Sequence, residues 1–348
     1  MKKFDVLLAG YFGFGNLGDE LLLSSALDYL ETAGVKKDRV AVLSRDPGET
    51  SATFGVEAFG RELFSLPLSR ALSASRSLIF PGGGIFQDSS SVRSCFYYWG
   101  LARKAISHSC RLAAISQSIG PLSNKLSKKM TRDALSRCRY LSVRDETSIA
   151  LSRELGLHVE STPDLVMGLK IPELPERSNG AALINIRPVR GSDACARTVL
   201  KAARAFASEG IPIRGTAFAR EDELELKRYI RSGELPKCDV ALVKNLNDFL
   251  SVSQDAFAAV GMRLHFGILS LKRGLGVAIA PYDPKVSDFA GKWGAKCPEL
   301  NGIKKNSDIM RVLTKALFED KKQPDHEKVR RAISGAFKNA LSRVLEDG

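Results

Sequence analysis

The sequence lacks the features that mark membrane, secreted and zinc-binding proteins. It has no apolar run near the roughly 18–20 residues that a membrane-spanning helix requires. Its six cysteines are scattered, with no C-x-x-C pair and no cysteine–histidine spacing suited to zinc. We therefore expect reduced thiols, a cytoplasmic location and no bound metal.

Low-complexity tracts and recognised nucleic-acid-binding motifs are also missing, although the net charge is +13. Because the basic residues are spread along the chain, we expect no nucleic-acid partner. Anionic substrates and peripheral contact with the anionic inner face of the plasma membrane would account for the charge. A basic surface without a function is the alternative.

Apolar strand-like runs alternate with amphipathic helical runs along all 348 residues, a length typical of two domains. This alternation predicts an α/β fold with two Rossmann-like, doubly wound parallel-sheet domains that face each other across a cleft. We expect the first domain over residues 1–172, a polar, proline-rich linker over 172–180 and the second domain over 180–322. Ligands in such sheets bind beyond the carboxyl ends of the strands.

The last segment, 323–348, contains a predicted basic amphipathic helix over residues 326–345. Its apolar face comprises Val329, Ile333, Phe337, Leu341 and Val344. We expect this face to pack back on the core, with a helix lying on a membrane surface as the alternative.

A five-residue motif, Gly261-Met262-Arg263-Leu264-His265, joins a short apolar strand to an apolar helix. The start of a helix collects partial positive charge and directs backbone amides outward. Arg263 and His265 at this place predict an anion site that contains a titratable group. A histidine that only packs in the core is the alternative.

The first glycine-rich segment, Gly13-Phe14-Gly15-Asn16-Leu17-Gly18, matches the G-x-G-x-x-G pattern of dinucleotide-binding folds. Asp19 and Glu20 follow at the start of the helix and would repel a pyrophosphate there. We therefore expect Asn16 and Asp19 to bind a hydroxyl-rich ligand, with a plain helix cap as the alternative for Asp19.

Two further motifs end strands of the first domain. Pro81-Gly82-Gly83-Gly84 allows a ligand to lie against the backbone at Gly83, and the nearby Asp88 is suited to bind sugar hydroxyls. A tight turn is the alternative. Arg144 closes another buried strand just before two acids, so that it points to the same edge or forms a structural ion pair.

Taken together and in this order, the motifs resemble the polysaccharide pyruvyl transferase family, in particular its CsaB-type members. The segments that carry the resemblance are Gly15-Asn16-Leu17-Gly18-Asp19-Glu20, Pro81-Gly82-Gly83-Gly84, Ser118-Ile119-Gly120-Pro121, Val143-Arg144-Asp145, Pro163-Asp164, Gly261-Met262-Arg263-Leu264-His265 and Tyr282-Asp283-Pro284-Lys285-Val286. Residues 44–75 and the C-terminal helix carry no motif that matches.

The resemblance implies a fold similar to the two-domain GT-B glycosyltransferases. It implies transfer of pyruvate from phosphoenolpyruvate onto a sugar as a cyclic ketal, with release of phosphate and without a cofactor. For CsaB-type enzymes the implied acceptor is N-acetylmannosamine in a lipid-linked precursor of a secondary cell wall polymer, which links the protein to cell wall biogenesis and S-layer anchoring. The first domain would then bind the acceptor and the second the phosphoenolpyruvate.

The resemblance also assigns roles to residues. The family's functional Arg corresponds to Arg144, its R-L-H motif to Arg263-Leu264-His265 and its downstream Lys to Lys285. We expect these last four residues to bind phosphoenolpyruvate. Histidine is the side chain best suited to act as a general acid near neutral pH, so we expect His265 to protonate the donor methylene. Lys285 would stabilise the departing phosphate, and Arg144 would stabilise charge.

Three other functions remain open on the sequence. A GT-B glycosyltransferase would use the same helix start for the diphosphate of a nucleotide sugar. A non-catalytic protein that binds anionic glycans or lipid phosphates would not depend on His265. A dinucleotide oxidoreductase would depend on Gly13 and Gly15 instead.

Overall fold

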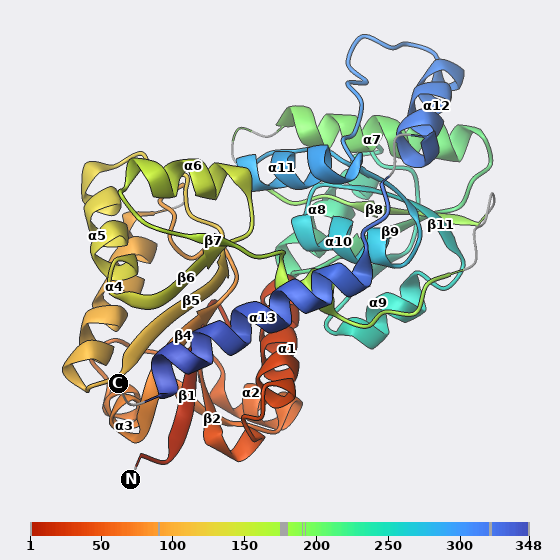
Figure 1. The fold of residues 1–348 in the computed structure, drawn as a ribbon. Helices are drawn as coiled ribbons and strands as arrows, with labels where there is room; N and C mark the ends of the chain where they lie inside the picture. The colour runs from red at the N-terminus through yellow and green to blue at the C-terminus, as the bar shows by residue number, and fades with distance from the viewer. Residues whose placement is uncertain are drawn as a thin grey trace. The chain divides into compact units, whose positions relative to one another are not determined.

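The computed structural model describes residues 2–89, 91–174, 180–189, 191, 193–319 and 322–346. The chain forms two compact units (Figure 1). Unit 1 comprises Met1–Phe14, Asp19–Leu169 and His326–Gly348, and unit 2 comprises Gly15–Gly18 and Lys170–Asp325. The chain therefore enters unit 2 for four residues near its start and returns to unit 1 at its end. Most of the expected linker, residues 175–179, lies outside the described residues.

Unit 1 is built on a seven-stranded parallel sheet with the order β3-β2-β1-β4-β5-β6-β7. The strands are β1 (Phe4–Ala9), β2 (Val40–Ser44), β3 (Glu57–Gly60), β4 (Ser75–Pro81), β5 (Arg111–Gln117), β6 (Cys138–Val143) and β7 (Glu160–Ser161). The central strands are almost continuously apolar because helices cover both faces of the sheet. The strand order reverses between β1 and β4, which is where open α/β sheets bind ligands.

Helices cover the two faces of this sheet. On one face, α3 (Leu66–Ala74), α4 (Val92–Ser107) and α5 (Lys125–Leu135) bury their apolar sides in a common core. Helix α1 (Leu17–Thr32) and helix α13 (His326–Leu345) pack together on the other face, where the Tyr29 and Phe337 rings stack with centroids 5.5 Å apart. The remaining elements are α2 (Pro47–Phe54), α6 (Glu146–Glu154) and the short 3-10 turns η1 (Lys37–Arg39) and η2 (Leu165–Gly168).

Helix α13 crosses the sheet of unit 1 over β4, β5 and β6 (Figure 1). All five residues of its predicted apolar face are buried. This face is therefore part of the core of unit 1 and is not exposed for binding to a membrane surface.

Unit 2 is built on a five-stranded parallel sheet with the order β10-β9-β8-β11-β12. The strands are β8 (Ala181–Asn185), β9 (Ile213–Ala217), β10 (Val240–Leu242), β11 (Ala256–Gly261) and β12 (Gly276–Ile279). The helices are α7 (Asp193–Ser208), α8 (Arg220–Arg231), α9 (Leu246–Val252), α10 (Leu264–Lys272), α11 (Pro284–Trp293), α12 (Asn306–Thr314) and the π-helical turn η3 (Lys315–Glu319). Here the strand order reverses between β8 and β11, so the carboxyl ends of these two strands are the expected ligand position.

The predicted fold class is confirmed, because both units are α/β domains with parallel sheets and the topology of Rossmann-like folds. The six cysteines form no disulfide in the structure. Within the part of the chain that the structure describes, no helix combines the length and apolar character that crossing a bilayer requires.

Candidate active site

The R-L-H motif lies at the carboxyl end of β11, at the point where the strand order of unit 2 reverses. Gly261 ends the strand because a larger residue has no room there: a Cβ would lie 2.7 Å from the Phe266 ring and 2.8 Å from the Asn185 Cβ. The buried Asn185 accepts the backbone N–H of Arg263 through Oδ1 (3.0 Å) and donates to the Thr216 carbonyl through Nδ2 (2.8 Å). The side chain that ends β8 thus holds the turn that begins α10.

Arg263 is buried, and two acids bind its guanidinium. Its Nε and Nη2 donate to the two carboxylate oxygens of Asp222 at 2.5 and 2.8 Å, and Nη2 also donates to Glu221 at 2.9 Å. Its Nη1 donates to Oδ1 of Asn16 at 3.4 Å. A bidentate carboxylate fixes the plane of a guanidinium and compensates its charge. In this structure Arg263 therefore orders the start of α10, and the charge of Asp222 offsets its own.

His265 is half-buried in the first turn of α10 and lies against the glycine-rich segment of residues 15–18. A Cβ on Gly18 would lie only 2.1 Å from Nδ1 of His265, so that only glycine allows this approach. The segment is held to unit 2 by the backbone N–H of Leu17, which donates to the Phe218 carbonyl at 2.9 Å. The first glycine motif thus shapes the surroundings of the imidazole.

Lys285 begins the next helix of the same edge. Helix α11 follows β12, the neighbour of β11, and Asp283 caps it by accepting the Lys285 backbone N–H at 3.1 Å. The Nζ of Lys285 lies 3.1 Å from the other Asp283 oxygen. Because β11 and β12 are adjacent and parallel, the first turns of α10 and α11 lie at the same edge of the sheet. His265 and Lys285 are therefore brought to one side of unit 2.

Arg187 is a further cation at this edge, and it was not among the predicted site residues. It lies two residues after β8 and donates to the Tyr282 hydroxyl at 2.7 Å, with its guanidinium 5.4 Å from the centre of that ring. A neutral phenol leaves the positive charge of Arg187 uncompensated by this contact. An Arg just beyond the carboxyl end of a buried strand, as in the sequence Asn185-Ile186-Arg187, is the signal that locates it.

Arg144 lies at the carboxyl end of β6 in unit 1, and its side chain is only 5% exposed. It forms an ion pair with Asp164, lies 4.0 Å from Asp145, and donates through Nε to the Ser118 hydroxyl at 2.9 Å. This geometry is that of a structural ion pair, which the sequence analysis gave as one of two alternatives for Arg144. A catalytic role for Arg144 stays a prediction.

The glycine loop after β4 is fixed by hydrogen bonds to its backbone carbonyls. Gly82 and Gly83 adopt φ values of 68° and 86°, in the left-handed region that glycine tolerates. The buried Gln117 donates to the Gly82 carbonyl at 2.7 Å, and the Ser118 backbone N–H donates to the Gly83 carbonyl at 2.8 Å. A Cβ on Gly83 would lie 3.9 Å from Oδ1 of Asp19, so these two predicted acceptor-binding residues lie close together.

The other two predicted acceptor-binding residues have different surroundings. Asp88 accepts the backbone N–H groups of Ser123 (2.9 Å) and Asn124 (2.8 Å) just before α5. Burial opposes its charge, but these amides outweigh it and lower the pKa of Asp88. Asn16 belongs to unit 2, where it contacts Arg263. The structure therefore places Gly83 beside Asp19, whereas Asn16 and Asp88 have hydrogen-bond partners of their own.

An aromatic pair beyond the carboxyl end of β1 was not predicted from the sequence. The Tyr11 and Phe14 rings stack with centroids 3.9 Å apart and an interplanar angle of 6°, and they are 44% and 41% exposed. The Arg61 guanidinium lies 5.0 Å from the Phe14 ring centre and donates to the Gly10 carbonyl. Exposed stacked rings at the edge that binds ligands form a platform for the apolar face of a sugar.

Glu20, in the first turn of α1, lies where its charge is disfavoured. Its Oε1 accepts the Gly13 backbone N–H at 2.8 Å. Burial, opposed by this bond and reinforced by the charges of Asp19 and Glu49, raises the pKa of Glu20 from 4.5 to about 7. Because the folded-state pKa is the higher one, the proton on Glu20 stabilises the fold most below pH 4.5, and this stabilisation is lost as the pH rises to 7.

We expect Glu20→Gln to match the wild type in stability near pH 4.5 and to exceed it by about 3 kcal/mol at pH 8, because glutamine keeps the acceptor without the charge. Denaturant unfolding followed at both pH values measures the difference. Glu49→Gln, at an exposed neighbour, is the control and should change little. A stability difference that is the same at all pH values would contradict the raised pKa.

Within the described ranges, no group of three or more His, Cys, Asp or Glu side chains gathers in a way that would hold a metal ion. The carboxyl edge of the sheet in unit 2 carries basic groups, a histidine and helix starts. The carboxyl edge of the sheet in unit 1 carries glycine backbone, one carboxylate and aromatic rings. The first set suits a small anion, and the second suits a sugar.

The sequence model of a family described as polysaccharide pyruvyl transferase matches residues 16–274. No curated protein sequence matches the chain significantly.

Solved structures with the GT-B fold resemble the chain over nearly its whole length. The UDP-GlcNAc 2-epimerase from Neisseria meningitidis, bound to UDP-GlcNAc, is 8% identical with a TM-score of 0.63, over 97% of this chain and 100% of the epimerase. A putative UDP-N-acetylglucosamine 2-epimerase from Listeria monocytogenes is 11% identical with a TM-score of 0.59, over 99% and 95% of the two chains. The UDP-GlcNAc 2-epimerase from Methanocaldococcus jannaschii is 10% identical with a TM-score of 0.59, over 94% and 98%. At these identities the likeness establishes the fold alone.

Proposed function

Since the chain belongs to the polysaccharide pyruvyl transferase family, we propose that it transfers pyruvate from phosphoenolpyruvate to a sugar as a cyclic ketal. The observation that carries the proposal is the R-L-H motif at the carboxyl end of β11, beside the start of α11 with Lys285. A histidine at a helix start among cations is suited to protonate a bound anion.

In the proposed reaction His265 donates a proton to the methylene carbon of phosphoenolpyruvate. One sugar hydroxyl attacks the adjacent carbon, phosphate leaves, and a second hydroxyl closes the ring. The two hydroxyls release two protons. One replaces the proton that His265 gave to the methylene carbon, and the other leaves with phosphate. Lys285 stabilises the departing phosphate as a point charge.

The cations of unit 2 divide the work of binding the donor. Arg263, whose charge Asp222 offsets, orients the turn that carries Leu264 and His265. Among the described residues, the hydrogen-bond partner of Arg187 is the neutral Tyr282, and we propose that Arg187 binds the carboxylate or phosphate through two parallel bonds. We propose Arg187 as a donor-binding residue beside Arg263, Leu264, His265 and Lys285.

Unit 1 is proposed to bind the acceptor. Asp19 and the Gly83 backbone are suited to bind hydroxyl groups, with Tyr11 and Phe14 beneath the ring of the sugar. In keeping with the resemblance to CsaB-type members, we propose N-acetylmannosamine in a lipid-linked precursor of a secondary cell wall polymer as the acceptor. We also propose Asp88 of unit 1 and Asn16 of unit 2 as acceptor-binding residues. The lipid carrier brings the protein into peripheral contact with the membrane.

Phosphate release from phosphoenolpyruvate, with and without a synthetic lipid-linked N-acetylmannosamine, tests the reaction. We expect release only with the acceptor present. Thermal stabilisation by phosphoenolpyruvate without release would keep the donor and require other sugars. If UDP-sugars protect the protein and phosphoenolpyruvate does not, the protein is a GT-B glycosyltransferase and the proposal is wrong.

The aromatic platform makes a separate prediction for the acceptor. Phe14→Leu removes the stacked ring at little cost in volume, and we expect the KM for the acceptor to rise about 3–10-fold, which corresponds to the 0.5–1.5 kcal/mol of an aromatic contact. The KM for phosphoenolpyruvate should not change. Phe64→Leu, at an aromatic residue that is 89% exposed in the same unit, is the control. If Phe14→Leu has the same acceptor KM as Phe64→Leu, the aromatic rings do not bind the acceptor.

A further inference from the structure

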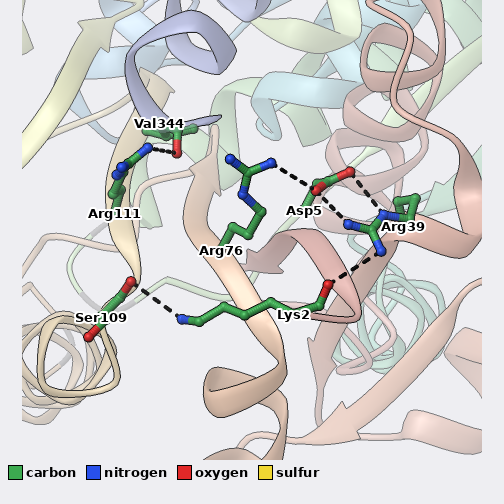
Figure 2. A pocket seen from close by; sticks show the side chains of 7 residues that line it. All are labelled: Lys2, Asp5, Arg39, Arg76, Ser109, Arg111 and Val344. Atoms are coloured by element: carbon green, nitrogen blue, oxygen red, sulfur yellow. Dashed lines mark hydrogen bonds and ion pairs between the residues drawn. The ribbon is translucent and has the colours of Figure 1, made fainter. Parts of the chain in front are cut away.

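A second cluster of basic side chains lies at the amino ends of the strands of unit 1, the edge opposite to the glycine loops. A cavity of about 620 Å³ opens there, and Figure 2 shows the side chains around it. Its polar lining comprises Lys2, Asp5, Arg39, Arg76, Ser109 and Arg111. This volume is within the range of small-molecule sites, about 300–1,000 Å³.

The topology of the sheet brings these cations together. Strands β2, β1, β4 and β5 are neighbours in the sheet, and all are parallel. Arg39 directly precedes β2, Lys2 lies just before β1, and Arg76 and Arg111 are the second and first residues of β4 and β5. Each of four adjacent strands therefore begins with a cation at the same edge. Strand β1 has six residues, so this edge is about 20 Å from the carboxyl ends at about 3.3 Å per residue.

The cavity carries an excess of positive charge from its lining. Among the described residues that line it, Asp5 is the one acid. It binds Arg39 through both oxygens, at 2.8 and 3.0 Å, and lies 3.6 Å from the Arg76 guanidinium. The hydrogen bond from Arg39, partly opposed by burial, lowers the pKa of Asp5, which therefore stays ionised. Four cations and one anion give the described lining residues a net charge of +3. Like charges gathered at one place repel one another, and an anion bound among them relieves this repulsion.

Part of this cluster has a structural task. Arg111 donates to the carbonyls of Val344 (3.3 Å) and Glu346 (2.7 Å), and Arg76 donates to the Leu345 carbonyl. Cations at the end of a helix stabilise its last carbonyls. This task does not explain the whole cluster, because Lys2 donates to Ser75 and His108 instead of to α13. Arg39 contacts Asp5 and the Lys2 carbonyl. In the described contacts, therefore, Lys2 and Arg39 line the cavity without bonding to α13.

We propose that this cavity is a second anion site, separate from the donor site of the proposed reaction. It binds a compact ligand that presents two or more phosphate oxygens. Arginine binds phosphate through two parallel N–H bonds, and lysine binds it as a point charge. The ligand is either a soluble phosphorylated molecule or the phosphate headgroup of an anionic lipid. The chemistry of recognition is the same for both.

Calorimetric titration of the full-length protein with inorganic pyrophosphate tests the site. We expect Lys2→Gln and Arg111→Gln each to weaken binding at least tenfold. Asp5→Asn, which removes the one acid, should strengthen binding. Lys3→Gln is the matched control, because Lys3 is exposed, pairs with Glu57 and does not line the cavity.

Lys285→Gln separates this site from the donor site, because it should leave the tight pyrophosphate binding intact. If Lys285→Gln abolishes the binding, or if Lys2→Gln and Arg111→Gln bind as the Lys3→Gln control does, the proposal is overturned. Failure of pyruvyl transfer with intact pyrophosphate binding would leave the second site standing on its own.

Sedimentation with vesicles identifies the source of the phosphate. Binding to phosphatidylglycerol vesicles, but not to phosphatidylcholine vesicles, that is lost in Lys2→Gln would assign a lipid headgroup. Pyrophosphate binding without vesicle binding would assign a soluble ligand. If neither probe distinguishes Lys2→Gln from Lys3→Gln, the cavity is no anion site.

Discussion

Replacing His265 with alanine is expected to lower kcat for pyruvyl transfer by roughly 10²–10⁴-fold, the range that general acid–base catalysis supplies. The physical reason is the loss of the group that protonates the donor methylene. The cations of unit 2 remain in this variant, so phosphoenolpyruvate should still raise its melting temperature. Acceptor-dependent phosphate release and a thermal shift, measured side by side, separate the chemical step from binding.

Two further histidine variants define the result. His265→Gln keeps a polar side chain of similar size but has no titratable proton, and it should be as inactive as His265→Ala. His158→Ala, at an exposed histidine of unit 1, should retain full activity. An active His265→Gln variant would show that the imidazole is not the acid. Loss of phosphoenolpyruvate binding together with activity would assign His265 to binding.

Gly18→Ala should lower kcat by about 10²-fold, the effect of displacing a catalytic group by about 1 Å. The added Cβ would lie 2.1 Å from Nδ1 of His265, so that the ring or the start of α1 must shift. An alanine inside a helix ordinarily stabilises it by up to about 1 kcal/mol relative to glycine. A loss of activity would therefore not come from a weakened helix. It would come from the contact of the added Cβ with the His265 ring.

Gly335→Ala is the matched control, because Gly335 lies within α13 and a Cβ there meets nothing within 4 Å. We expect this variant to be fully active and slightly more stable than the wild type. A Gly18→Ala variant with normal activity would mean that the approach of residue 18 to the imidazole is not needed for catalysis. Circular dichroism of both variants establishes that their folds are intact.

The electrostatics of unit 2 differ from what the basic motif alone suggests. Arg263 is bound by Asp222 and Glu221, and Lys285 lies beside Asp283. These acids hold the cations in place and lower the net charge near the proposed donor site. Arg187 thereby becomes the cation with the least compensation from its hydrogen-bond partner. Tight binding of a donor with both carboxylate and phosphate groups would then depend on Arg187 more than on Arg263.

Much of the fold could be predicted because buried parallel strands are apolar along their whole length and turns are marked by glycine and proline. The expected second domain over residues 180–322 begins with β8 (Ala181–Asn185), and the predicted terminal helix at 326–345 is α13 (His326–Leu345). Strand β3 (Glu57–Gly60) was not predicted, because its residues are only half-buried or exposed and carry no apolar run. Strand β7 has two exposed residues and gives no signal at all.

The surroundings of the site residues were harder to predict, because they depend on residues far apart in the chain. Asp222 binds Arg263 from 41 positions away, and nothing near Asp222 in the sequence indicates this. Asn16 and Asp19 are three residues apart, yet Asn16 contacts Arg263 of unit 2 and Asp19 belongs to unit 1. Spacing along the chain does not indicate that Asn16 contacts Arg263, and a shared role in acceptor binding for Asn16 and Asp19 stays a prediction.

By itself, the sequence determined two parallel α/β domains, the family motifs and the position of His265 at a helix start, since each depends on a local pattern of apolar, glycine and charged residues. Only the tertiary structure decided which acids compensate Arg263, that Gly18 abuts the imidazole, and that four strands begin with cations around one cavity. The physical reason is that charge compensation and close packing depend on distances in space, which the order of strands in a sheet sets and the order of residues does not.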